Sequence, residues 1–220
     1  DYTGVSNGTL YEAYFGDSVS FMSSEEERQK YLDTADKKRS VPALQNSFNT
    51  TVLGAVYARL GEGDLARQCL NNAVKGCAMS NLAFVDKDWR GMGVCGSGVW
   101  TPVQLHVNMT FAHVVQQMLL YSSGDLIKVF PALPTDWKKV KFSGYQTESG
   151  ATVAAEYNGE KNVMKVTLSA KRQTSVILVL PDFAKKITKH NLPEKPIGKE
   201  ISMSVSAGRE VTIHIKCSAR

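Results

Sequence analysis

The chain contains 220 residues, of which 43% are hydrophobic and 21% are charged, with a formal net charge of +5. This balance is typical of a globular protein, and the length fits one large domain or two small ones. No apolar run approaches the roughly 18 to 20 residues of a membrane-spanning helix, so we expect no membrane span. Residues 1–4 have neither the basic nor the apolar region of a signal peptide, and we expect none there.

The charge is divided unevenly along the chain. Residues 1–125 carry 10 basic and 13 acidic side chains, a net −3, whereas residues 126–220 carry 16 basic and 8 acidic ones, a net +8. The step predicts a boundary near Asp125, with a helical domain over 1–125 and a second domain over 126–220. A basic domain could bind nucleic acid or acidic glycans. Because no basic run is interleaved with stacking aromatics, we favour a soluble lysine-rich surface and expect no nucleic-acid partner.

The first domain has the pattern of helices. Residues 24–38 carry three glutamates, at 25–27, near their start and two lysines, at 37 and 38, at their end, which suits the helix dipole. Residues 47–60 place apolar side chains at helical spacing, and Gly61 follows as a terminating glycine. Asp64 can cap the next helix, so a short link joins two helices into a hairpin. A further helix is expected to run to about Ser122.

An irregular segment over residues 81–108 interrupts these helices. It contains two of the three tryptophans, four glycines and little periodicity. Long irregular segments inside a compact domain are usually functional or disordered. The tryptophans and an arginine favour a functional loop.

The four cysteines are Cys69, Cys77, Cys95 and Cys217. Their spacing is not that of zinc ligands, so we expect no metal site. Buried free thiols are the favoured interpretation. A single disulfide is the alternative.

The second domain has the pattern of β-strands. Strands are predicted over 152–157, 163–169 and 175–180, and near 201–205 and 211–215, from alternating or continuous apolar residues. Asn158 and Gly159, between the first two runs, indicate a hairpin. Several short strands separated by turns indicate an antiparallel β-sandwich.

Four stretches follow one another in the order of a known family. They read Y-A-R-L-G-E-G-D at 57–64, P-V-Q-L-H-V-N at 102–108, M-L-L-Y-S at 118–122 and V-F-P-A-L-P at 129–134. In that order they resemble W-A-R-L-G-D-G-D, P-F-Q-I-D-G-N, M-L-L-Q-S and L-L-P-A-L-P of glycoside hydrolase family 95. This family of six-hairpin glycosidases contains α-L-fucosidases and α-L-galactosidases.

The resemblance implies a multidomain α+β chain, in which the C-terminal helices of an (α/α)6 barrel precede an antiparallel β-sandwich. It implies that most of the barrel lies upstream of Asp1 in the same polypeptide, because the helical half supplies too few helices to close one. It also implies a periplasmic or secreted enzyme of carbohydrate metabolism, without a cofactor, whose partner is an oligosaccharide or polysaccharide.

The sequence departs from the family at the expected catalytic stretch. Family members use a Glu as general acid and an Asn, polarised by an Asp, to activate water, and the Glu and Asn are expected upstream of this chain. His106 stands where the Asp belongs. A neutral imidazole can accept a proton but brings no fixed negative charge, so either His106 is the base or the site is altered. The alternative is a structural histidine near a helix start, with His113 as a second structural histidine on the same face.

We predict a sugar-binding site on the irregular segment, with His106 catalytic and with substrate bound by Trp89, Arg90, Trp100, Gln104 and Asn108. The tryptophans could stack on sugar faces, although core packing is the usual role of either alone. Gln104, His106 and Asn108 alternate, so they would point to one side of an extended segment. Asn108 could instead be the N-cap of the following helix.

These observations favour the C-terminal portion of a glycoside hydrolase that acts on α-L-fucosides or related glycans with inversion. Inverting enzymes hold two catalytic groups roughly 6.5–9.5 Å apart, and we expect this chain alone to be inactive. The alternative is a non-catalytic glycan-binding or structural module with the same fold. A nucleic-acid binder, the least favoured function, would lose affinity steeply with salt.

Overall fold

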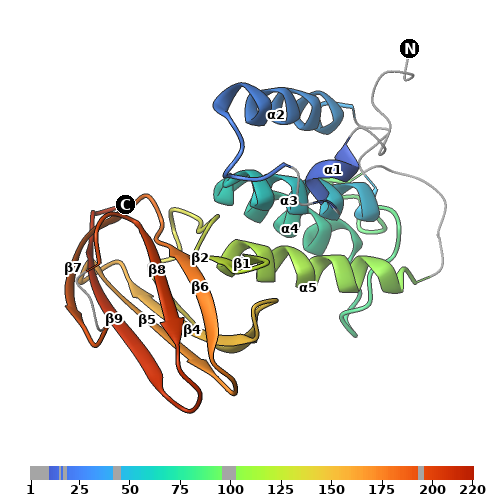
Figure 1. Cartoon of the computed structure of the whole chain (residues 1–220). Helices are drawn as coiled ribbons and strands as arrows, with labels where there is room; N and C mark the ends of the chain where they lie inside the picture. The colour runs from blue at the N-terminus through green and yellow to red at the C-terminus, as the bar shows by residue number, and fades with distance from the viewer. Residues whose placement is uncertain (1–9, 15, 17–18, 42–45, 96–102, 193–195) are drawn as a thin grey trace. The chain divides into compact units, whose positions relative to one another are not determined.

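The computed structural model describes residues 10–14, 16, 19–41, 46–95, 103–192 and 196–220 (Figure 1). The chain divides into two compact units. A helical unit comprises Asp1–Met118 and Ala132–Pro134, and a strand unit comprises Leu119–Pro131 and Thr135–Arg220. The structure is therefore of the α+β class, with helices and strands segregated along the chain.

The described helices of the first unit are α1 (Tyr11–Tyr14), α2 (Glu25–Arg39), α3 (Ser47–Leu60), α4 (Gly63–Cys77) and α5 (Leu105–Leu119). They do not form a closed barrel, so the predicted (α/α)6 architecture stays a prediction. None of the described helices has the length and apolar character needed to cross a membrane.

Local interactions set the start of α2 and both ends of α3. The Ser24 hydroxyl accepts a hydrogen bond from the Glu27 amide at the start of α2. At the start of α3, the Asn46 side-chain oxygen accepts a hydrogen bond from the backbone N–H of Asn49. Gly61 ends α3 in the left-handed conformation with φ of 91°, which glycine adopts without a steric cost. The predicted helices 24–38 and 47–60 are thereby confirmed within one residue at each end.

The predicted cap of α4 is wrong. The helix begins at Gly63, its N-cap position is Glu62 and not Asp64, and the Glu62 side chain makes no capping hydrogen bond. An ideal Cβ on Gly63 would lie 2.7 Å from the carbonyl carbon of Ala132. The absence of a side chain therefore lets residue 132 pack directly on the first turn, ahead of Asp64.

Helices α3, α4 and α5 of the helical unit lie close together (Figure 1), and a second glycine stands at their contact. An ideal Cβ on Gly54 of α3 would lie 3.3 Å from the Cys69 Cβ of α4 and 3.5 Å from the Val114 Cγ1 of α5. Both faces of α3 are covered, so nearly the whole helix is buried instead of only the predicted apolar stripe.

The second unit contains a four-stranded and a five-stranded sheet. The first has the order β1-β2-β6-β8, from β1 (Leu120–Ser123), β2 (Leu126–Val129), β6 (Thr174–Val179) and β8 (Glu200–Val205). The second has the order β3-β4-β5-β9-β7, from β3 (Lys139–Gln146), β4 (Ala151–Asn158), β5 (Val163–Ala170), β9 (Glu210–Cys217) and β7 (Ala184–His190). All pairs are antiparallel except β2 with β6, an arrangement consistent with a β-sandwich.

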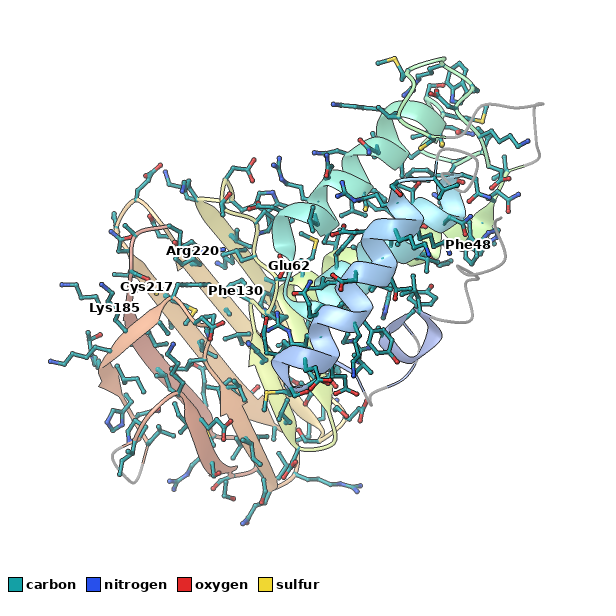
Figure 2. All side chains as sticks on the ribbon, turned by 90° about the horizontal axis from the view of Figure 1, so that it is seen from above. Phe48, Glu62, Phe130, Lys185, Cys217 and Arg220 are labelled. Atoms are coloured by element: carbon teal, nitrogen blue, oxygen red, sulfur yellow. The ribbon has the colours of Figure 1, made fainter. Side chains whose placement is uncertain are left out.

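Aromatic side chains fill part of the strand unit's core. The rings of Phe130 and Phe142 lie edge to face with centroids 5.6 Å apart, and those of Tyr157 and Phe183 lie 5.1 Å apart. The guanidinium of Arg220 covers the Phe183 ring at 4.7 Å. Figure 2 labels Phe130, Cys217 and Arg220 on this unit. Arg220 thus adds a cation–π contact to the aromatic cluster of this unit.

The five predicted strands are confirmed as β4, β5, β6, β8 and β9, and the hairpin at Asn158 joins β4 to β5. Strands β1, β2, β3 and β7 were not predicted from the sequence. The last helix ends at Leu119 and β1 starts at the next residue, so residues up to Ser122 that were expected to be helical form a strand. Their pairing with β2, as between Leu120 and Val129, overrides helical periodicity.

Candidate functional site

Trp89 and Arg90, predicted to bind sugar, lie at the C-terminal end of α4. The Arg90 guanidinium donates to the carbonyl oxygens of Val74 and Lys75, at 3.0 and 3.1 Å. The Trp89 indole donates to the Ala78 carbonyl at 3.3 Å, and Arg90 stacks on its ring at 4.8 Å. These bonds satisfy carbonyls that a helix end leaves open. The Trp89 side chain is still 46% exposed, so one face is available to solvent.

Gln104 and Asn108 hold the segment that follows α4. The backbone N–H of Gln104 donates to the Phe84 carbonyl oxygen at 2.8 Å. The Asn108 side chain accepts from the Phe84 amide at 3.3 Å and donates to the Leu82 carbonyl at 2.8 Å. Asn108 lies inside α5, so the alternative in which it is the N-cap is wrong.

His106 lies in the first turn of α5 and is exposed. Its ring contacts Phe48 edge to face, with centroids 4.9 Å apart, and Figure 2 labels Phe48. Because the chain is helical from Leu105, the expected alternation of Gln104, His106 and Asn108 on an extended segment is wrong. Trp100 lies outside the described residues. The roles predicted for these residues stay predictions.

A cavity of about 350 Å³ opens in the helical unit beside the same face of α5. Its lining residues are Tyr14, Arg59, Met109, Thr110 and His113. Met109, Thr110 and His113 follow His106 by three, four and seven positions, a spacing that places all four on one face of the helix. The cavity therefore begins one helical turn beyond the predicted catalytic residue. Its volume is in the range of small-ligand pockets.

The polar groups of this cavity come from three helices. The Tyr14 hydroxyl of α1 and the Thr110 hydroxyl of α5 are 3.1 Å apart and buried. Arg59 of α3 is 6% exposed, and its guanidinium donates to the Gly16 carbonyl at 3.1 Å. A nearly buried guanidinium beside two hydroxyls provides fixed donors for a polar ligand.

His113 is the fourth polar residue of the cavity, and its surroundings favour the neutral form of its imidazole. Burial lowers the pKa of His113, and the nearby Arg59 charge lowers it further. A neutral imidazole keeps one nitrogen as an acceptor and the other as a donor. Its ring lies edge to face with Tyr14, with centroids 6.1 Å apart. Together the four side chains can donate to and accept from adjacent hydroxyl groups, as a sugar requires.

Sequence reasoning assigned none of these five lining residues to a site, and it expected His113 to be structural. Arg59 lies in the stretch 57–64, but its side chain had no predicted partner. One sequence signal could have located the cavity: the spacing of His106 and His113, which places both on one face of a helix. Tyr14 lies 96 residues before Thr110, and no local pattern joins them. Among the described residues, no group of three or more His, Cys, Asp or Glu side chains could hold a metal ion.

No protein-family model and no curated protein matches the chain. Among solved structures, the chain is similar to Ara127N-Se, a GH127 β-L-arabinofuranosidase from Geobacillus stearothermophilus T6, with a TM-score of 0.40 and 13% sequence identity. The match covers 93% of this chain and 40% of that enzyme, so the chain spans less than half of its length.

Proposed function

We propose that this chain is the C-terminal portion of a glycoside hydrolase and that the cavity beside α5 is part of its glycan site. The support begins with the four stretches in family order over residues 57–134. Two of them lie in contact, because Gly63 packs on the backbone of Ala132 and Leu133. Contact between separated stretches indicates that they act as one structural unit.

The observation that carries the proposal is the polar set of the cavity. Arg59 belongs to the stretch 57–64, and Met109 and Thr110 directly follow the stretch 102–108. Two family-like stretches thus lead into one cavity with a guanidinium, an imidazole and two hydroxyls. Sugar-binding sites need several such groups in fixed positions, and a thioether such as that of Met109 adds an apolar contact.

In this proposal His106 is the general base of an inverting reaction. Its exposure leaves the imidazole accessible, and its position one turn from Met109 brings it to the edge of the cavity. The general acid is expected from residues outside this chain. Trp89, Arg90, Trp100, Gln104 and Asn108 are proposed to shape the approach to the site, and the substrate is proposed to be an α-L-fucoside or a related glycan. A periplasmic or secreted location is part of the same proposal.

Equilibrium binding of a fucosylated oligosaccharide, measured by calorimetry, tests the proposal. Thr110→Val removes one hydroxyl from the cavity and keeps the side chain's shape, so affinity should fall by about tenfold. Thr51→Val is the matched control, since the Thr51 hydroxyl is buried in α3 and donates to the Ser47 carbonyl. It should leave affinity unchanged. Absence of binding to fucosides, galactosides and other glycans would contradict the proposal.

A second candidate function is a non-catalytic glycan-binding module. The cavity's own groups favour it, because hydroxyls, a guanidinium and a neutral imidazole bind sugars without cleaving them. The two functions differ when a longer polypeptide that contains this chain is assayed with aryl fucosides. Hydrolysis supports the enzyme, and glycan binding without hydrolysis supports the module.

A further inference from the structure

A second cavity, of about 410 Å³, lies elsewhere in the helical unit and contains thiols. Its described lining residues are Arg39, Thr50, Gln68, Cys69, Asn72, Gly93, Val94 and Cys95. Among the residues that the structure describes, none lines both this cavity and the cavity beside α5. All four cysteines of the chain are free and buried, so two free thiols face this space.

Cys95 has the most polar surroundings of these thiols. Its sulfur lies 4.0 Å from the Thr50 hydroxyl oxygen and 3.5 Å from the Asn72 carbonyl oxygen. Cys77 belongs to the same buried cluster as Cys95. As a thiol, Cys95 donates a hydrogen bond to the Asn72 carbonyl oxygen. As a thiolate, its sulfur can accept a hydrogen bond from the Thr50 hydroxyl. Cys95 is 7% exposed and Cys77 is fully buried, so a small reagent in the cavity meets Cys95 first.

The fold brings Cys77 and Cys95 together through the glycine before Cys77. An ideal Cβ on Gly76 would lie 3.3 Å from the side chains of Asp88 and Val94. The segment that ends at Cys95 therefore packs closely on the last turn of α4. Both cysteines belong to one buried cluster with Ala73, Phe84 and other apolar residues.

The electrostatics distinguish the two thiols. The hydrogen bond from Cys77 lowers the pKa of Cys95, burial opposes this, and Thr50 adds to the lowering. The same hydrogen bond raises the pKa of Cys77, and burial raises it further. Burial raises the pKa of Cys69 to about 12. The direction of these shifts favours Cys95 as the attacking thiol, because the thiolate is the nucleophile.

We propose that Cys95 is a thiol–disulfide exchange site that accepts a small-molecule disulfide in this cavity and passes it to Cys77. The Cys95 thiolate attacks one sulfur of the disulfide, forms a mixed disulfide and releases one small thiolate. Cys77 then loses its proton and attacks the Cys95 sulfur, which forms the Cys77–Cys95 disulfide and releases the second small thiol. The two protein thiols are oxidised and the small disulfide is reduced to two thiols, so atoms and electrons balance.

The test is incubation of the folded chain with glutathione disulfide, followed by alkylation and peptide mass mapping. The expected wild-type product has lost two hydrogens and links Cys77 to Cys95. Cys77→Ser should accumulate one glutathionyl group on Cys95, because the resolving thiol is missing. Cys95→Ser should leave Cys77 reduced. Cys69→Ser, the matched control in the same cavity, should behave as the wild type.

The rate at which Cys95 is alkylated gives a second readout, which does not depend on the cysteine variants. Thr50→Val should slow alkylation of Cys95 severalfold, since the thiolate loses one hydrogen bond. Cys217, buried in the strand unit, reports unfolding if it is labelled. Labelling of Cys69 or Cys217 as fast as Cys95 would overturn the proposal. So would a native chain in which no cysteine reacts while denaturant exposes all four.

Discussion

The backbone of Gly63 lies against the backbone of Ala132, and this contact joins the turn between α3 and α4 to the segment after β2. An ideal Cβ on Gly63 would lie 2.7 Å from the Ala132 carbonyl carbon and 2.8 Å from that of Leu133. Real Cβ atoms do not approach backbone this closely, and backbone cannot move aside as a flexible side chain can. Glycine at position 63 is therefore a packing requirement.

Gly63→Ala should destabilise the chain by about 1 to 3 kcal/mol, because the added methyl group overpacks this contact. Denaturation by urea measures the change. Gly76→Ala gives a graded comparison, since the atoms nearest its added Cβ are side-chain atoms at 3.3 Å. Side chains relieve overpacking more readily than backbone does, so this variant should lose less stability than Gly63→Ala. Equal stability of Gly63→Ala and the wild type would contradict the packing account.

His113 should make the stability of the chain fall in mild acid. Its pKa is lowered in the folded state by burial and then by Arg59, whereas an unfolded histidine titrates near 6.5. The unfolded chain therefore binds the proton more tightly, and folded stability declines as pH falls below roughly 6.5. His113→Gln removes this contribution, so the stability difference between wild type and variant should change with pH there. A pH-independent difference between pH 7 and pH 5 would refute the assignment.

Lys38 should make the stability of the chain rise with pH in the alkaline range, the same direction as the effect of His113 in mild acid. Its side chain is 1% exposed, and burial lowers its pKa from 10.5 to about 8. Between these values the unfolded chain holds the proton that the folded chain has lost, so this residue's contribution to stability rises with pH. The gain is at most about 3 kcal/mol.

Lys38→Met removes that contribution and isolates it from Cys69, whose raised pKa acts in the opposite direction. The stability advantage of the variant should be largest at pH 8 and shrink towards pH 10.5. Lys37→Met, at the exposed neighbouring position, is the control and should show no such trend. A constant difference for Lys38→Met across this range would rule out the lowered pKa.

Substitution of His106, the proposed base, should change catalysis and stability to different extents. In an active polypeptide that contains this chain, His106→Ala should lower kcat by about 10² or more if the imidazole accepts the proton. The melting temperature should change little, because the side chain is exposed and a single aromatic contact, with Phe48, would be lost with the ring. A lower melting temperature with an unchanged kcat would assign His106 to structure.

The chain alone is expected to hydrolyse no aryl fucoside or galactoside, because the general acid is proposed to lie outside it. Hydrolysis by the purified 220-residue chain would contradict that assignment.

Local signals account for what the sequence predicted well. Asn46 and Gly61 mark the ends of α3 through interactions within a few residues, and β4, β5 and β9 alternate because one face of each is buried. β3 and β7 escaped prediction for a physical reason. Both are edge strands with exposed lysines, and register shifts at Phe142 and at Ala184 break their alternation.

The candidate site was less predictable, because it depends on contacts between distant residues. Asn108 sits in a stretch that resembles a catalytic one, yet its amide binds the backbone at Leu82 and Phe84. Tyr14 and Thr110 meet only after α1 and α5 pack in the same unit. Sequence spacing indicates which residues share one face of α5. The side chains of α1 and α3 that line the cavity with them are known only from the packed structure.

The most direct test of the glycan site is the Met109 methyl signal in a chain labelled with [¹³C-methyl]methionine. Met109 lines the cavity beside α5, while Met164 is buried in the strand unit. Titration with a fucosylated oligosaccharide should shift the Met109 signal in a saturable manner and leave Met164 unchanged, and Thr110→Val should weaken the response. A Met109 signal that stays unchanged while the oligosaccharide binds, or a shift confined to Met164, would contradict the account.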